Sequence, residues 1–156
     1  MAEKLFGTNG VRGVVNEDMT ADLALQVGKA MGRYMRGQVV IATDTRVSAE
    51  MIRSAVSAGL MAVGCKVLDL GVIPTPALQY FVKTHDYVSG GVMITASHNP
   101  PQFNGIKCIA SDGTEMHKYG EEKIEALYRQ VIPANPWNTI GSIEKVIGAA
   151  DSYINA

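Results

Sequence analysis

The chain has 156 residues, the size of one domain, with 47% hydrophobic residues, 19% charged residues and a formal net charge of -1. This balance gives no electrostatic case for binding nucleic acid or an anionic membrane. The N-terminus lacks the apolar region of a signal peptide, and no apolar run is long enough to span a membrane. We therefore expect a compact, cytoplasmic protein that has neither a nucleic-acid nor a membrane partner.

The first segment that suggests chemistry runs from Lys4 to Gly13 and reads K-L-F-G-T-N-G-V-R-G. Its three glycines would let backbone amides approach an anion, and Arg12 offers a planar set of donors that suits a phosphate or a carboxylate. The Asn-Gly pair is also the commonest signal for a tight turn. Taken alone, this segment favours a plain turn over an anion site.

From residue 20 to residue 95 the sequence alternates between helical and strand patterns. Thr20 and Ser48 are expected to cap the first two helices. Thr75 is expected to cap the third, with Pro76 in its first turn. The expected helices cover residues 21–36, 49–63 and 76–84. The expected strands cover residues 39–42, 66–70 and 90–95.

This alternation predicts parallel strands joined by right-handed crossovers, with helices on both faces of the sheet. In such sheets, ligands bind beyond the carboxyl ends of the strands. The loops that fall there cover residues 43–46, 71–76 and 95–101. In the first of them, Asp44 and Arg46 are expected to form a local ion pair that braces the loop, and direct catalysis is the alternative.

The two cysteines, Cys65 and Cys108, lie far apart in the sequence, and their spacing matches no metal-binding motif. Both lie in apolar surroundings that resemble strands. We therefore interpret them as reduced core residues.

After residue 101 the pattern changes. Residues 106–110 and 114–116 predict an antiparallel hairpin at the edge of the sheet, and residues 121–131 predict an amphipathic helix. The fold is therefore expected to be of the α/β class, a three-layer α/β/α arrangement. Its mixed, mostly parallel sheet would have about four strands, followed by a C-terminal hairpin and helix. Residues 1–136 would form this domain, and residues 137–156 a linker and the start of a second domain.

The most informative stretch begins as the apolar strand at residues 90–95 and breaks at once into Thr-Ala-Ser-His-Asn-Pro-Pro. The prolines prevent a helix and favour a rigid loop. Ser97 and His98 lie in this loop, where a hydroxyl can be aimed at a substrate with little conformational entropy left to lose. Lys107 follows soon after. It would be either a solvated edge residue or an electrostatic or acid-base partner of Ser97.

Five motifs resemble the first domain of the α-D-phosphohexomutases. This family includes phosphomannomutase, phosphoglucomutase and phosphoglucosamine mutase. The motifs are F-G-T-N-G-V-R-G at residues 6–13, D-T-R at 44–46, G-V-I-P-T-P at 71–76, T-A-S-H-N-P at 95–100 and N-G-I-K at 104–107. The resemblance covers essentially the whole chain.

The resemblance implies that Ser97 is a phosphoserine that exchanges its phosphoryl group with a hexose phosphate through a bisphosphorylated sugar. His98 and Lys107 would assist proton movement and charge stabilisation around Ser97. Arg12 would contact the phosphoserine or the bound phosphosugar.

The resemblance also implies that Thr8 and Asn99 bind substrate or phosphate together with Arg12 and Lys107. One Mg²⁺ ion would be held partly through the phosphate on Ser97. In the family, its other ligands come from an Asp-x-Asp-x-Asp loop in the second of four domains. No two aspartates of this chain are two positions apart.

We therefore expect a first domain that is inactive by itself, whose partners are the remaining domains, a hexose phosphate and a hexose bisphosphate. A surface made for another domain should be apolar, so self-association is also expected. Two alternatives are a flavodoxin-like module that binds an anion without catalysis, and a serine hydrolase. The absence of a G-x-S-x-G turn and the position of His98 directly after Ser97 disfavour the hydrolase.

Overall fold

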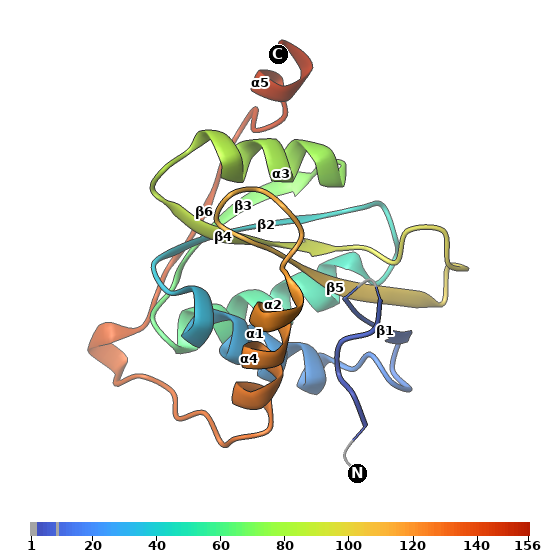
Figure 1. The fold of residues 1–156 in the computed structure, drawn as a ribbon, viewed down its shortest axis with the longest axis vertical. Helices are drawn as coiled ribbons and strands as arrows, with labels where there is room; N and C mark the ends of the chain where they lie inside the picture. The colour runs from blue at the N-terminus through green and yellow to red at the C-terminus, as the bar shows by residue number, and fades with distance from the viewer. Residues whose placement is uncertain (1–2, 9) are drawn as a thin grey trace.

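A computed structural model describes residues 3–8 and 10–156 and shows one mixed sheet between two helical layers (Figure 1). The six strands have the order β1-β5-β4-β2-β3-β6. Neighbouring strands from β4 to β6 in this order are parallel, whereas β5 runs antiparallel to both β4 and β1. The strands are β1 (Val11–Val14), β2 (Gln38–Thr43), β3 (Lys66–Val72), β4 (Val88–Ile94), β5 (Phe103–Ile109) and β6 (Ile143–Lys145). The predicted fold class is confirmed.

The helices cover both faces of this sheet, as Figure 1 shows. On one face lie α1 (Ala21–Met35), α2 (Ala49–Ala62) and α4 (Lys118–Tyr128). On the other lie α3 (Thr75–Thr84) and the short α5 (Asp151–Ile154). Each face has its own apolar core: Ile41 and Ile94 point toward the first group of helices, and Val40 and Met93 toward α3. Nearly all residues of β2 and β4 are buried, and successive side chains point to opposite faces, so one sheet carries two cores.

The predicted cap positions agree with the structure at two helices, α1 and α2, and differ at α3. Thr20 caps α1, because its Oγ1 accepts a hydrogen bond of 3.1 Å from the Leu23 amide. Ser48 precedes α2 but makes no side-chain cap bond. Its hydroxyl instead accepts a hydrogen bond of 2.9 Å from the side-chain Nδ2 of the buried Asn104. At α3 the prediction was wrong by one residue, since Pro74 occupies the cap position and Thr75 is the first helical residue.

Two predictions about strands also need correction. The segment before residue 14 was expected to be a plain turn, but its turn between Gly7 and Gly10 leads directly into β1. Asn9, part of that predicted turn, lies outside the described residues. The predicted hairpin is reduced to one bridge between Ile109 and Glu115, because β5 pairs with β1 and β4 and is not an edge strand.

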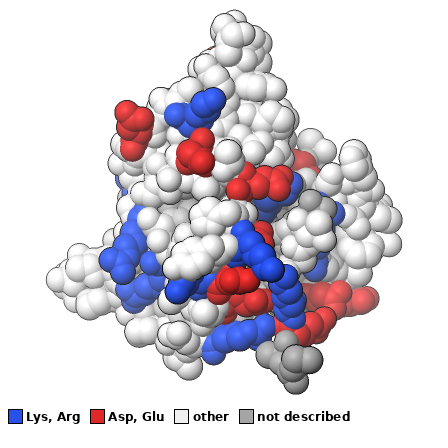
Figure 2. All heavy atoms as spheres, viewed as in Figure 1, with Lys and Arg blue, Asp and Glu red and all other residues white. Residues whose placement is uncertain are grey.

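The segment after residue 136 contributes both to the sheet and to its cover. It contains the 3₁₀ turn η1 (Trp137–Thr139), the strand β6 beside β3, and α5. Many of the large apolar side chains that are exposed in the described residues belong to this part of the chain: Trp137, Ile140, Ile143, Ile147, Tyr153 and Ile154, with Val131 shortly before it. On the face that Figure 2 shows, the surface around α5 is largely uncharged, although α5 begins with the exposed Asp151, whereas acidic and basic side chains are interspersed over α4.

Both cysteines are free and buried, as predicted. Burial raises the pKa of the Cys108 thiol to about 12 and also raises the pKa of Cys65. Both thiols therefore stay protonated at neutral pH. None of the helices that the structure describes combines the length and the apolar character needed to cross a bilayer.

Helices α1 and α2 pack closely because glycines face each other across their contact. A Cβ atom added to Gly59 would lie 2.3 Å from the carbonyl oxygen of Leu25, and one added to Gly28 would lie 2.4 Å from that of Val56. In both cases the obstacle is backbone, which cannot turn aside as a flexible side chain can. The distance between the two helices therefore depends on these two residues.

We expect Gly59→Ala to destabilise the protein by about 1 to 3 kcal/mol in urea unfolding. The steric cost of overpacking should exceed the gain in helix propensity, which is at most about 1 kcal/mol. Ser54→Ala, on the exposed side of the same helix, is the control and should change the free energy of unfolding by less than about 0.5 kcal/mol. Equal stability of the two variants would contradict this account of the helix contact.

Candidate functional site

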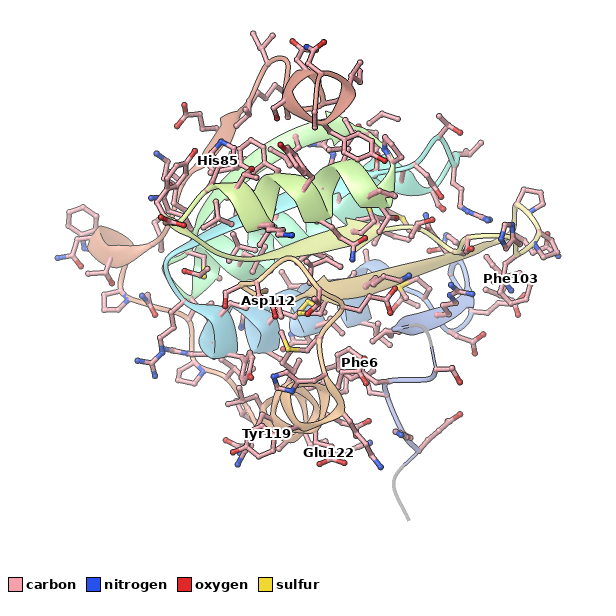
Figure 3. All side chains as sticks on the ribbon, turned by 45° about the horizontal axis from the view of Figure 1, so that its top comes forward. Phe6, His85, Phe103, Asp112, Tyr119 and Glu122 are labelled. Atoms are coloured by element: carbon pink, nitrogen blue, oxygen red, sulfur yellow. The ribbon has the colours of Figure 1, made fainter. Side chains whose placement is uncertain are left out.

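The loop between β4 and β5 forms a pocket at the carboxyl end of β4, together with residues of β1 and β5. The pocket has a volume of about 370 Å³. Its lining residues are Arg12, Ser97, His98, Asn99, Pro100 and Lys107. Phe103, labelled in Figure 3, opens β5 at the same end of the sheet. All four residues predicted to be catalytic thus lie together.

Ser97 is exposed at the mouth of the pocket, in an uncommon backbone conformation. Its φ of 53° lies in the left-handed region, which non-glycine residues rarely adopt. Its amide donates a hydrogen bond of 3.1 Å to Thr95 Oγ1, and the Thr95 hydroxyl donates one of 2.8 Å to Asp44 Oδ2. The hydroxyl of Ser97 is therefore accessible, while its backbone is held by the end of β2.

Arg12 reaches the pocket from β1, where it pairs with Gly105 of β5. A Cβ atom on Gly105 would lie 2.8 Å from Arg12 Cγ, so the missing side chain makes room for the arginine to cross the strand. Arg12 Nη1 donates a hydrogen bond of 2.8 Å to Asn99 Oδ1. Its buried Nε has no hydrogen-bond partner among the described residues. The guanidinium is thus fixed beside the Ser97 loop and keeps donor capacity for an anion.

Lys107 lies two residues beyond Gly105 on β5, so the alternation of side chains places it on the same face of the sheet as Arg12. Its side chain is 15% exposed, and Nζ lies 3.0 Å from Glu115 Oε1. Because β5 lies between β1 and β4, Lys107 is not a solvated edge residue. Glu115, a neighbour that we did not predict, is brought there by its bridge to Ile109.

Thr8 is separated from this group. It is exposed and lines a neighbouring pocket of about 330 Å³, to which Arg12 also contributes, but it does not line the pocket of Ser97. Asp44 and Arg46 do not line the pocket of Ser97 either. They are paired at 3.3 Å behind the loop. The predicted residues therefore divide into a group around Ser97, a supporting pair and one outlying threonine.

The side chains that line the pocket of Ser97 are neutral or positively charged, and none is a carboxylate. Within residues 3–8 and 10–156, no three His, Cys, Asp or Glu side chains are grouped in a way that would hold a metal ion. The carboxylate of Asp44 is engaged by Arg46 and Thr95. The described residues around Ser97 therefore offer no carboxylate cluster for a hard cation such as Mg²⁺.

The chemical character of the pocket follows from these placements. An exposed hydroxyl shares it with a guanidinium, an ammonium group and an imidazole. Arginine and lysine together suit a phosphate group, the first by directed hydrogen bonds and the second as a point charge. The arrangement can therefore bind an anionic ligand next to a potential nucleophile.

Comparison with known proteins gives one family match over most of the chain. Residues 3–134 match the family model described as phosphoglucomutase/phosphomannomutase, alpha/beta/alpha domain I. A phosphoglucomutase/phosphomannomutase of Thermococcus kodakarensis is 43% identical in an alignment 149 positions long, which covers 91% of this chain and 32% of that protein. A probable phosphoglucosamine mutase of Pyrococcus abyssi is 44% identical over 155 residues, 98% of this chain and 34% of that protein.

Solved structures agree with these matches. A phosphoglucomutase/phosphomannomutase family protein from Burkholderia thailandensis has a TM-score of 0.85 at 27% identity, over 99% of this chain and 35% of that one. A putative phosphomannomutase from Thermus thermophilus has a TM-score of 0.78 at 35% identity, over 94% of this chain and 34% of that one. The chain spans about a third of the length of the curated relatives that it matches.

Proposed function

Because the chain belongs to the phosphoglucomutase/phosphomannomutase family, as its α/β/α domain I, we propose that it is the phosphoserine-carrying part of a phosphohexomutase. The full-length enzyme would interconvert a hexose 1-phosphate and a hexose 6-phosphate. The observation that carries this proposal is the exposed Ser97 hydroxyl, held in one pocket with Arg12 and Lys107.

In the proposed step, Ser97 Oγ attacks one phosphorus atom of a hexose bisphosphate. The bond from phosphorus to the sugar oxygen breaks, a bond from phosphorus to Oγ forms, and the serine proton passes to the departing sugar oxygen. A serine monoester resembles the sugar monoester in energy, so the transfer runs easily in both directions. A phosphohistidine would lie too high in energy to be regenerated from a sugar ester.

Such a transfer depends on positioning and on neutralising the negative charge of the transferring group. Arg12 and Lys107 supply positive charge on the sheet face beside Ser97, and His98 would assist proton movement. Asn99 orients the Arg12 guanidinium through its side-chain oxygen. Thr8 would contact, from the neighbouring pocket, the part of the substrate that lies farther from Ser97. A bound Mg²⁺ would supply further neutralisation, and the phosphate on Ser97 would be one of its ligands.

The experiment that tests this proposal incubates the chain with glucose 1,6-bisphosphate and Mg²⁺ and measures its intact mass. We expect wild-type protein to gain one phosphate and Ser97→Ala to gain none. Subsequent addition of a hexose monophosphate should remove the phosphate. A flavodoxin-like module that only binds anions would gain no phosphate in either form, and this result would overturn the proposal.

We further propose that complete turnover takes place in a cytoplasmic enzyme in which the other domains of the relatives supply the remaining metal and sugar contacts. The exposed apolar side chains between residues 131 and 154 offer a surface on which such a domain, or a second copy of the chain, would pack. The 156-residue chain alone should then carry a phosphate without catalysing full isomerisation at the rate of a complete enzyme.

A further inference from the structure

The side chain of Arg46 makes more contacts with the Ser97 loop than its place in the sequence suggests. It follows β2 by three residues, and its side chain is only 12% exposed. Its two terminal nitrogens donate hydrogen bonds to four backbone carbonyls between β4 and β5. These belong to Ser97 (3.1 Å), Asn99 (2.7 Å), Pro100 (2.7 Å) and Phe103 (3.0 Å).

This loop has an unusual need for such a donor. Pro100 and Pro101 have no backbone N–H, so the loop has fewer donors than acceptors and cannot satisfy its own carbonyls locally. The planar guanidinium of Arg46 presents five N–H donors in fixed directions. An ammonium group in its place would carry the same charge but could not direct bonds to four carbonyls and a carboxylate at once.

The same arginine is linked to the other side of Ser97. Its Nε donates to Asp44 Oδ2 at 3.3 Å, and this oxygen also accepts the hydrogen bond of the Thr95 hydroxyl. Thr95 Oγ1 in turn accepts from the Ser97 amide. The N–H and the C=O of Ser97 are therefore both held by one connected network, across a residue whose φ is 53°.

A left-handed serine costs free energy and persists only where surrounding contacts over-determine it. The Arg46 network provides such contacts. Arg46 itself does not line the pocket, so it does not touch a ligand that is bound there. A substitution of Arg46 that keeps its charge would therefore affect chemistry through the backbone of the loop.

We infer that Arg46 is a positioning residue that locks Ser97 in the backbone conformation from which its hydroxyl enters the pocket of Arg12 and Lys107. The inference rests on the proposed phosphoryl transfer to Ser97. It adds a residue that holds the backbone of the Ser97 loop from outside the pocket. Misplacement of a reacting group by about 1 Å costs roughly 100-fold in rate. Arg46→Lys, which keeps the charge, should therefore slow the gain of phosphate by roughly 10- to 100-fold.

The test measures the time course of phosphate gain from glucose 1,6-bisphosphate, together with amide hydrogen exchange. The matched control is Arg33→Lys, because Arg33 donates to one backbone carbonyl, that of Pro133, at 2.9 Å and does not line the pocket of Ser97. In Arg46→Lys the rate constant should fall while the final phosphate per chain reaches the wild-type value. The amides of Ser97, Asn99 and Phe103 should exchange faster. Arg33→Lys should change neither quantity.

Two results would overturn the inference. The first is a wild-type rate constant in Arg46→Lys. The second is a lower final amount of phosphate with an unchanged rate constant, because this indicates a partly unfolded population and not a misplaced serine. If wild-type protein gains no phosphate, the proposed function fails by itself. Hydrogen exchange then decides the inference. Faster exchange of the loop amides in Arg46→Lys, but not in Arg33→Lys, supports the role of Arg46 in holding the backbone of Ser97, and unchanged exchange refutes it.

Discussion

Replacing Arg12 with alanine is expected to slow phosphoryl transfer to Ser97 by roughly 100-fold, which corresponds to about 3 kcal/mol in the barrier. Arg12 lines the pocket with Ser97, and within the described residues only its Nη1 donates a hydrogen bond, to Asn99, so part of the guanidinium is left for the transferring group. The loss should appear in the rate of phosphate gain from glucose 1,6-bisphosphate, followed by intact mass.

Two further variants make this prediction specific. The rate of phosphate gain in Arg12→Lys should lie between the rates of Arg12→Ala and wild type, because lysine keeps the charge but lacks the planar set of donors. Arg36→Ala removes an arginine that lines another pocket and should leave the rate unchanged. A wild-type rate in Arg12→Ala would show that the guanidinium serves the loop through Asn99 and not the phosphate.

Removal of Arg53 should have the largest effect on stability. Arg53 of α2 is ion-paired with Asp69 of β3, whose side chain is only 4% exposed. Breaking a buried pair by removing one partner typically costs about 3 to 5 kcal/mol, because the remaining charge stays buried without compensation. The only other hydrogen bond of that carboxylate within the described residues comes from the Gly71 amide, at 2.9 Å. We therefore expect Arg53→Ala to lower the free energy of unfolding in urea by several kcal/mol.

The control for Arg53 is its second partner, Glu50, whose side chain is 76% exposed. Exposed ion pairs contribute about 0 to 1 kcal/mol, so Glu50→Ala should have little effect. Comparable losses in the two variants would mean that the pair of Arg53 with Glu50, and not its pair with the buried Asp69, accounts for the stability.

The parts of the fold that were predictable from sequence are those decided by local pattern. The stripe of apolar residues in α1 and its Thr20 cap depend on contacts a few positions apart, and both agree with the structure. Strand β1 was missed because its glycine-rich sequence has little strand character of its own. Its existence depends on pairing with β5, about ninety residues later. The three-residue β6 was missed for the same reason, since its pairing with β3 is not visible in its exposed sequence.

The site residues, too, include some that local sequence predicted and some that depend on distant contacts. Ser97 was predictable because an apolar strand that ends in a proline-rich loop is a local signal, and topology placed that loop at a binding edge. The ion pair of Asp44 and Arg46 was visible as two charges two positions apart. The hydrogen bonds from Arg46 to carbonyls more than fifty residues away could not be predicted, because every residue has a backbone carbonyl and the sequence does not show which of them Arg46 contacts. Glu115 beside Lys107 was likewise hidden by the misassigned hairpin.

The most direct measurement locates the phosphate after incubation with glucose 1,6-bisphosphate, by fragmenting the peptide that contains Ser97 and His98 and by testing the acid stability of the bond. We predict an acid-stable monoester on Ser97. An acid-labile phosphate on His98, or a phosphate outside residues 95–101, would contradict the proposal that this serine carries the phosphoryl group.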